Sequence, residues 1–69
     1  MTLSYLSNTF KGSVLENHIL ATNNKKQLEN GLRYNVNAIE YWKEQGNQEQ
    51  VDFFQDAVNL RNKKLQAIA

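Results

Sequence analysis

The 69-residue sequence contains no cysteine and only one histidine, His18. Disulfide bonds, thiolate zinc sites and a cysteine nucleophile are therefore excluded, and one histidine does not make a conventional metal cluster. A chain of this length buries a core too small to be comfortably stable alone. Because neither disulfides nor a metal can support the core, we expect self-association to do so.

The chain also lacks an excess of charge and any long apolar run. Eight Lys and Arg residues against seven Asp and Glu give a net charge of +1, whereas nucleic-acid-binding domains are usually strongly basic. No apolar segment approaches the ~20 residues of a membrane span, and no basic region followed by an apolar stretch opens the chain. We expect a cytoplasmic protein without membrane contact, for which nucleic acid is not the favoured partner.

Proline is absent, and apolar residues recur at helical spacing on both sides of Gly46. Two rows of residues with this spacing face each other if the chain folds back at Gly46. We predict an all-α fold in one domain, 1–69, with an N-terminal segment, 1–22, and a long antiparallel helical hairpin, 24–67, that assembles into a helical bundle. The facing rows are Leu28, Leu32, Asn35, Ile39 and Trp42, and Val51, Phe54, Val58, Arg61 and Leu65.

Local capping signals agree with this hairpin. Asn24 is expected to open the first long helix, which runs to Gln45, and Asn47 to open the second. Gly46 fits a left-handed residue that ends the first helix. These signals predict helices at 24–45 and 47–67.

The N-terminal segment is less clear. Ser13 and Glu16 form a capping box that predicts a short helix ending near Ala21. Before it, an apolar row predicts one face of another short helical segment, although a β-hairpin over 3–20 that turns at Lys11–Gly12 stays open. The apolar row consists of Leu3, Leu6 and Phe10.

Residues 38–47 (AIEYWKEQGN) and 53–60 (FFQDAVNL) resemble the hairpin of a tetratricopeptide repeat. That family places aromatic residues on the first helix, glycine at the turn, and aromatic residues followed by alanine on the second. The second helix is one residue short of the family spacing, and the chain has no second copy. We attribute the similarity to the shared requirements of helical hairpins. Membership would imply a peptide-binding scaffold and not an enzyme.

No group of residues has the spacing of a catalytic or metal site. His18 has no evident partner for acid–base chemistry, and the serines lack the context of a nucleophile. The carboxylate pairs Glu40/Glu44 and Asp52/Asp56 lie four residues apart, where we expect solvated, mildly repulsive side chains. We therefore predict a non-enzymatic protein with no catalytic residues, metal or cofactor.

Two polar residues, Asn35 and Arg61, interrupt the apolar rows of the hairpin. An asparagine in such a row can fix the register and the oligomeric state. Arg61 is expected to pack its aliphatic stem and extend its charged head to solvent. A functional alternative makes both residues polar contacts to a partner chain.

A second apolar stripe, Phe53, Leu60 and Ala67, lies on the opposite side of the last helix. A helix with two apolar faces must be covered on both. The N-terminal segment can cover one flank, and we expect another chain, most simply in a dimer, to cover the other. The alternative is that the N-terminal segment wraps both flanks of a monomer. The bulky residues expected at a partner or oligomer interface are Tyr34, Tyr41, Phe53 and Leu60.

These observations favour a small helical adaptor or inhibitor that self-associates and masks a surface on a target protein. Short, Asn- and Lys-rich chains of this kind are common in phages and mobile elements. One alternative is a nucleic-acid-binding regulator that uses the basic end of the hairpin. Another is a nucleotide- or metabolite-binding sponge with pockets between subunits. The residues expected to contact a polyanion are Lys25, Lys26, Arg61, Lys63 and Lys64.

Overall fold

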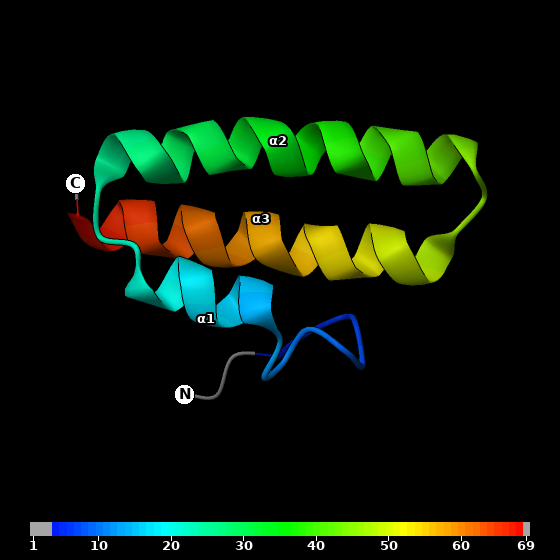
Figure 1. Ribbon diagram of the computed structural model, residues 1–69, viewed down its shortest axis with the longest axis horizontal. Coiled ribbons are helices and arrows are strands. Elements are labelled where there is room, and N and C mark those ends of the chain that lie inside the picture. The colour runs from blue at the N-terminus through cyan, green and yellow to red at the C-terminus, as the bar shows by residue number, and fades with distance from the viewer. Residues whose placement is uncertain (1–3, 69) are drawn as a thin grey trace.

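The computed structural model describes residues 4–68, which form three α-helices and no strand (Figure 1). They are α1 (Val14–Ala21), α2 (Lys25–Glu44) and α3 (Gln48–Ile68). Helices α2 and α3 run antiparallel and pack along their length, and α1 packs mainly on α3. The predicted all-α class is confirmed, and the β-hairpin alternative is wrong for the part of 3–20 that is described.

The turn between α2 and α3 depends on Gly46, whose φ of 71° lies in the left-handed region. The Gly46 N–H donates to the carbonyl of Lys43 over 3.1 Å, and the Asn47 N–H donates to that of Trp42 over 3.0 Å. This is the Schellman arrangement, which satisfies the last carbonyls of a helix and favours glycine. The Asn47 side chain then accepts a hydrogen bond from the Gln50 N–H at the start of α3.

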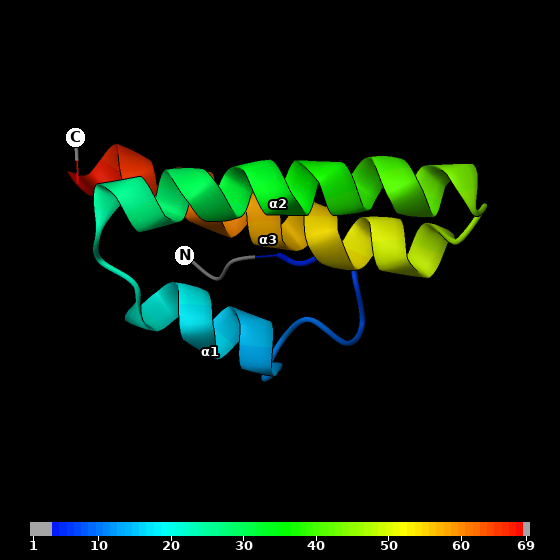
Figure 2. The ribbon, with the colours of Figure 1, turned by 45° about the horizontal axis from the view of Figure 1, so that its top comes forward.

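Helix α3 lies at the centre of the molecule, between α2 and the N-terminal third of the chain. Figure 2 shows the N-terminal loop, residues 4–13, running from beside α3 to the start of α1. The N-terminal loop and each of the three helices contribute to one buried cluster, so the core holds these elements together. This cluster consists of Phe10, Ile19, Leu28, Ala57 and Leu60.

Phe10 attaches the N-terminal loop to the second apolar stripe of α3. Its ring is fully buried and makes edge-to-face contacts with Tyr5 and Phe53, with ring centroids 4.8 Å and 5.3 Å apart. Such aromatic contacts stabilise the fold by more than the burial of their apolar area alone. The N-terminal third of the chain therefore covers Leu60 and part of Phe53, whereas Ala67, at the end of the stripe, is exposed.

The N-terminal loop is held by a buried carboxylate. The Asp56 side chain is 1% exposed and accepts hydrogen bonds from the backbone N–H groups of Leu6 and Ser7, each over 2.8 Å. The Ser7 hydroxyl also accepts one from the Thr9 N–H, a local bond that competes with helix formation.

Two predictions are corrected by this arrangement. The helical segment expected around Leu6 and Phe10 does not form, because the backbone N–H groups bond to side chains, while Leu3 lies outside the described residues. Asp56 is buried and hydrogen-bonded, and not solvated beside Asp52 as expected.

The predicted helix start at Ser13 is confirmed, but the Glu16 half of the capping box is shifted by one residue, from the Ser13 N–H to the Gly12 N–H. The Ser13 hydroxyl accepts a hydrogen bond from the Glu16 N–H, and the Glu16 carboxylate accepts one from the Gly12 N–H. The same carboxylate accepts a 2.6 Å hydrogen bond from the Tyr5 hydroxyl. Burial, then the bond to Glu16 and the charges of Glu16 and Asp56, raise the pKa of Tyr5 to about 12. The Tyr5 hydroxyl and the Gly12 N–H hold the pKa of Glu16 below its usual value.

Replacing Asp56 by asparagine should lower the free energy of unfolding by ~1–3 kcal/mol, because an amide offers one acceptor oxygen to two buried N–H groups. Asp52→Asn is the matched control on the same helix, since Asp52 bonds only an exposed Gln48 side chain. Urea unfolding of both variants measures the difference. Equal effects would show that the Asp56 carboxylate does not hold the loop.

Stability should also fall at high pH because of Tyr5. The folded state keeps the Tyr5 proton up to a pKa of about 12, above the ordinary 10.0, so this contribution is complete below pH 10.0 and lost as pH approaches 12. The contribution of Glu16 has the opposite sense: its pKa is lowered, so it is present at neutral pH and lost in acid. Tyr5→Phe should reduce both losses in urea unfolding experiments across pH. An unchanged pH profile would contradict this assignment.

Candidate functional site

The outer face of α2 carries two exposed tyrosines. Tyr34 is 76% exposed and Tyr41 is 54% exposed, and they lie two helical turns apart. Asn30 and Asn37 complete a stripe at helical spacing, which we call the tyrosine stripe. No described segment covers it, because α3 packs on the other side of α2.

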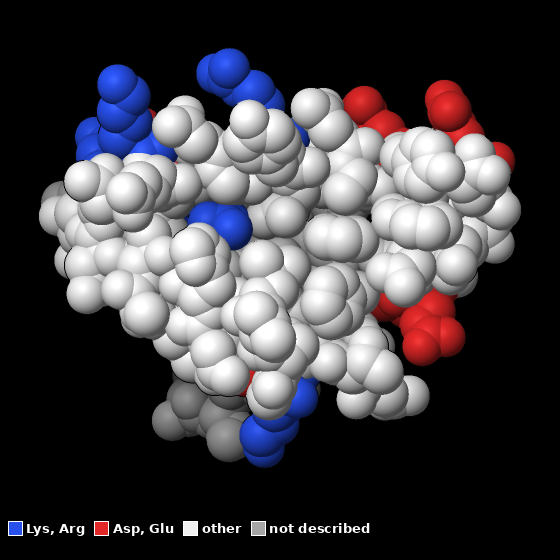
Figure 3. Space-filling model, viewed as in Figure 1, with Lys and Arg blue, Asp and Glu red and all other residues white. Residues whose placement is uncertain are grey.

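Charges of opposite sign gather at the two ends of the molecule. In Figure 3, Lys and Arg gather over the start of α2 at the upper left, and Asp and Glu around the α2–α3 turn at the right. Arg33 and Glu40 are exposed on one flank of the tyrosine stripe, toward the basic and the acidic end respectively. The surface around the stripe is therefore positive at one end and negative at the other.

The predicted polyanion-binding group is only partly available. Lys25, Lys26 and Lys63 are exposed. Lys64 is half-buried, and its ammonium donates to the carbonyls of Ile19 and Leu20 at the end of α1, over 3.1 Å and 2.6 Å. A cation at the carboxyl end of a helix also complements the helix dipole. Lys64 thus links α3 to the end of α1. Of the predicted group, Lys25, Lys26 and Lys63 are the exposed cations that a polyanion could contact.

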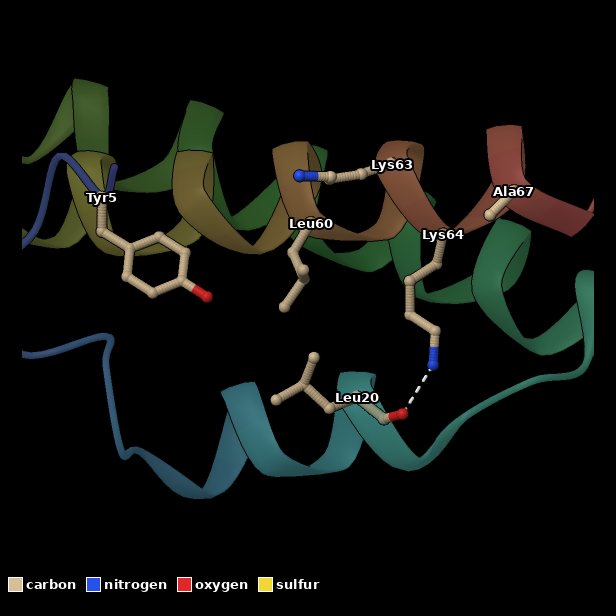
Figure 4. Close-up of a pocket in the computed structure, with 6 residues that line it drawn as sticks. All are labelled: Tyr5, Leu20, Leu60, Lys63, Lys64 and Ala67. Atoms are coloured by element: carbon tan, nitrogen blue, oxygen red, sulfur yellow. Dashed lines mark hydrogen bonds between the residues drawn. The ribbon is translucent and has the colours of Figure 1, made fainter. Parts of the chain in front are cut away.

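A groove of about 450 Å³ separates α1 from α3 (Figure 4). Leu20 and Leu60 face each other across it, Tyr5 lies at one end, and Lys64 reaches across to the Leu20 carbonyl at the other. Leu60 is 5% exposed.

Two of the four predicted interface residues are therefore not on the surface that was expected. Leu60 belongs to the core, and Phe53 packs against it and against the ring of Phe10. Phe53 is half-buried and Leu60 is buried, so neither is a fully exposed side chain in this structure. Tyr34 and Tyr41 remain exposed.

The two polar residues of the hairpin rows bond to each other. The Arg61 Nε donates to the Asn35 Oδ1 over 2.7 Å, and both side chains are buried. The expectation that the Arg61 head extends freely to solvent is wrong, because its side chain is only 5% exposed. Burial lowers the pKa of Arg61.

Gly31 makes room for this arginine. It lies in the middle of α2, one turn before Asn35, and a Cβ atom added there would overlap the Arg61 guanidinium. The guanidinium therefore lies directly against the backbone of α2. A glycine inside a long helix costs stability, so a close approach of another group is the usual reason for one. This signal was present in the sequence but was not connected with Arg61.

Arg61 lines a hollow of about 350 Å³ between α1 and α2, which we call the Arg61 hollow. His18 comes from α1, Arg61 from α3 and the remaining residues from α2, so all three helices contribute. The side chains that line it are His18, Gln27, Asn30, Tyr34, Asn35 and Arg61. The charge of Arg61 thus lies among side chains that can form hydrogen bonds, at the edge of the tyrosine stripe.

Comparison with family models, curated proteins and solved structures gives no match. Within residues 4–68, no group of three His, Asp or Glu side chains could hold a metal ion. None of the helices described is both long and apolar enough to cross a membrane.

Asn35 provides a test of the buried pair. Asn35→Leu should lower the free energy of unfolding by ~1–3 kcal/mol, because the Arg61 Nε–H loses its acceptor. Asn35→Asp keeps an oxygen in that place and adds a charge opposite to that of Arg61, so it should be at least as stable as the native chain. Urea unfolding ranks the three proteins. A leucine variant more stable than the native chain would show that the hydrogen bond contributes nothing.

Proposed function

We propose that this chain is a non-enzymatic protein–protein interaction module that forms a dimer through α2 and masks a surface on a target protein. The observation that carries the proposal is the exposure of Tyr34 and Tyr41 on one face of a rigid helix. Aromatic anchors with charges at their rim are typical of protein interfaces, where a few desolvated side chains provide most of the binding energy.

A second copy of the chain suits the tyrosine stripe because the stripe is nearly self-complementary. Asn37 lies near the midpoint between Tyr34 and Tyr41, and also near that between Arg33 and Glu40. A two-fold axis at Asn37 would pair two α2 helices antiparallel, with Tyr34 of each copy against Tyr41 of the other. Such an interface is isologous, so every contact occurs twice.

The same arrangement matches the charges. With the axis at Asn37, Arg33 of each copy faces Glu40 of the other, and the basic end of each molecule lies beside the acidic end of its neighbour. In a parallel arrangement, like charges would face each other, which is unfavourable. Charge complementarity therefore favours the antiparallel dimer over other uses of this face.

The dimer would place two copies of the Arg61 hollow on one assembly. Gly31 and Asn35 lie on one flank of the tyrosine stripe and Arg33 and Glu40 on the other, while Asn30 and Tyr34 belong both to the stripe and to the lining of the hollow, so the hollow would open at the edge of the paired stripes. A target protein could then bind along this edge. The role proposed for the dimer is that of an adaptor or inhibitor that works by covering its target.

Charge reversal tests the dimer. Arg33→Glu and Glu40→Arg should each weaken self-association, because like charges would then meet across the interface, whereas the double variant should restore it. Light scattering at micromolar concentration should give twice the chain mass of 8.0 kDa for the native and double variants and a lower mass for each single variant. Circular dichroism checks that all four proteins are helical.

A native protein that stays at 8.0 kDa at every concentration would overturn the dimer. Single and double variants with the same mass as the native protein would instead show that it associates through another face.

A further inference from the structure

We propose that the Arg61 hollow binds one carboxylate group, presented by an Asp or Glu side chain of the target protein. The source of the carboxylate rests on the proposed function, whereas the chemistry of the hollow rests on the geometry of Arg61 and its neighbours.

Arg61 has a buried charge without a matching anion. Its side chain is 5% exposed, and among residues 4–68 its one recorded hydrogen bond is that from Nε to Asn35, with no carboxylate in ion-pair contact. Buried charges are normally paired, because removing an ion from water is costly. The lowered pKa of Arg61 has burial as its cause and reflects this cost.

The unused donors of Arg61 point to the hollow. A guanidinium has five N–H donors, and the bond to Asn35 uses only the one on Nε. In the described part of the chain, no fully buried side-chain nitrogen or oxygen lacks a hydrogen-bond partner. The two Nη atoms therefore keep contact with solvent, and the hollow that Arg61 lines is the place where a ligand could accept from them.

The guanidinium is also fixed in place before a ligand arrives. Asn35 holds its Nε, and the bare backbone of Gly31 supports it from the side of α2. A donor pair that is already oriented loses little freedom on binding. The amides of Gln27 and Asn30 line the same hollow and can donate further hydrogen bonds to an anion.

The charge of the hollow matches a carboxylate better than a phosphate. The planar arginine fork fits the two oxygens of a carboxylate, and both groups carry one unit of charge. A phosphomonoester carries about −1.5 to −2 at neutral pH and gains most from several cations. The exposed lysines Lys25, Lys26 and Lys63 do not line the hollow.

A protein side chain suits this position because of Tyr34. The tyrosine lines the hollow and is 76% exposed, so it stands at the edge of the opening as a surface for apolar contact. A target that contacts the edge of this ring on the side of the hollow, and not the face that pairs with the second copy, would place a neighbouring acidic side chain within reach of Arg61. The pair would then supply an aromatic anchor and a desolvated ion pair, which together give both affinity and specificity.

Nuclear magnetic resonance titration of the native chain tests the proposal with matched peptides. The peptides are capped at both ends and contain one glutamate, one glutamine or one phosphoserine at the same position. The glutamate peptide should shift the Arg61 Nε–H signal and the Gly31 and Asn35 amides, and saturate with a Kd on the order of millimolar, as expected of one charge-assisted contact. The glutamine peptide should bind at least about tenfold more weakly, which corresponds to the loss of one such contact.

Three variants complete the experiment. Asn35→Asp supplies a carboxylate within the chain, so it should fold and lose glutamate binding by about tenfold or more. Arg61→Lys keeps the charge but loses the planar fork, and should also bind more weakly. Lys43→Gln removes an exposed cation elsewhere on α2 and should bind as the native chain does.

Several outcomes would overturn the inference. Equal shifts with glutamate and glutamine peptides would exclude carboxylate recognition, and tighter binding of phosphoserine would assign the hollow to phosphate. Shifts centred on Lys25, Lys26 and Lys63, or native-like binding by Asn35→Asp, would place the anion elsewhere. The titration requires neither a dimer nor a target, so its failure would leave the charge-reversal result intact, and the reverse also holds.

Discussion

Helix α3 must be covered on two sides, and the rest of the structure follows from this requirement. α2 covers one side along its length, and α1 with the N-terminal loop covers the other. Phe10 packs against Phe53 of the second stripe. Asp56, on the same side of α3, accepts hydrogen bonds from two backbone N–H groups of the loop and so holds it in place. A chain with so small a core thus uses every element against the same helix.

The hairpin could be predicted from the sequence because its signals are local. Asn24, Gly46 and Asn47 each act within a few residues of their own position, and helical periodicity then fixes which residues face inward. The N-terminal loop could not, because the bonds that shape it join residues about fifty positions apart in the sequence. The spacing of Asp52 and Asp56 is that of an exposed pair, and nothing local in the sequence distinguishes the buried carboxylate from the accessible one.

In the candidate site, too, local features could be predicted from the sequence and long-range contacts could not. The exposure of Tyr34 and Tyr41 could be predicted, since both lie beside the apolar row on α2. The pairing of Arg61 with Asn35 was missed, because each was interpreted alone against an apolar partner in the opposite row. Arginine is long enough to reach one turn along the facing helix, and Gly31 gives it the space to do so.

Asp56 and Arg61 show how differently this chain treats its two buried charges. They lie five residues apart on α3, and both are at most 5% exposed. The Asp56 carboxylate accepts hydrogen bonds from two backbone N–H groups, so its buried charge is compensated within the fold. The Arg61 guanidinium donates to one neutral oxygen, that of Asn35, and faces a hollow lined with side chains that can form hydrogen bonds. Since a buried charge is costly unless it is compensated, a charge whose compensation lies outside the chain is best explained by a ligand that supplies it. This contrast separates the carboxylate that holds the fold together from the arginine for which we propose a ligand.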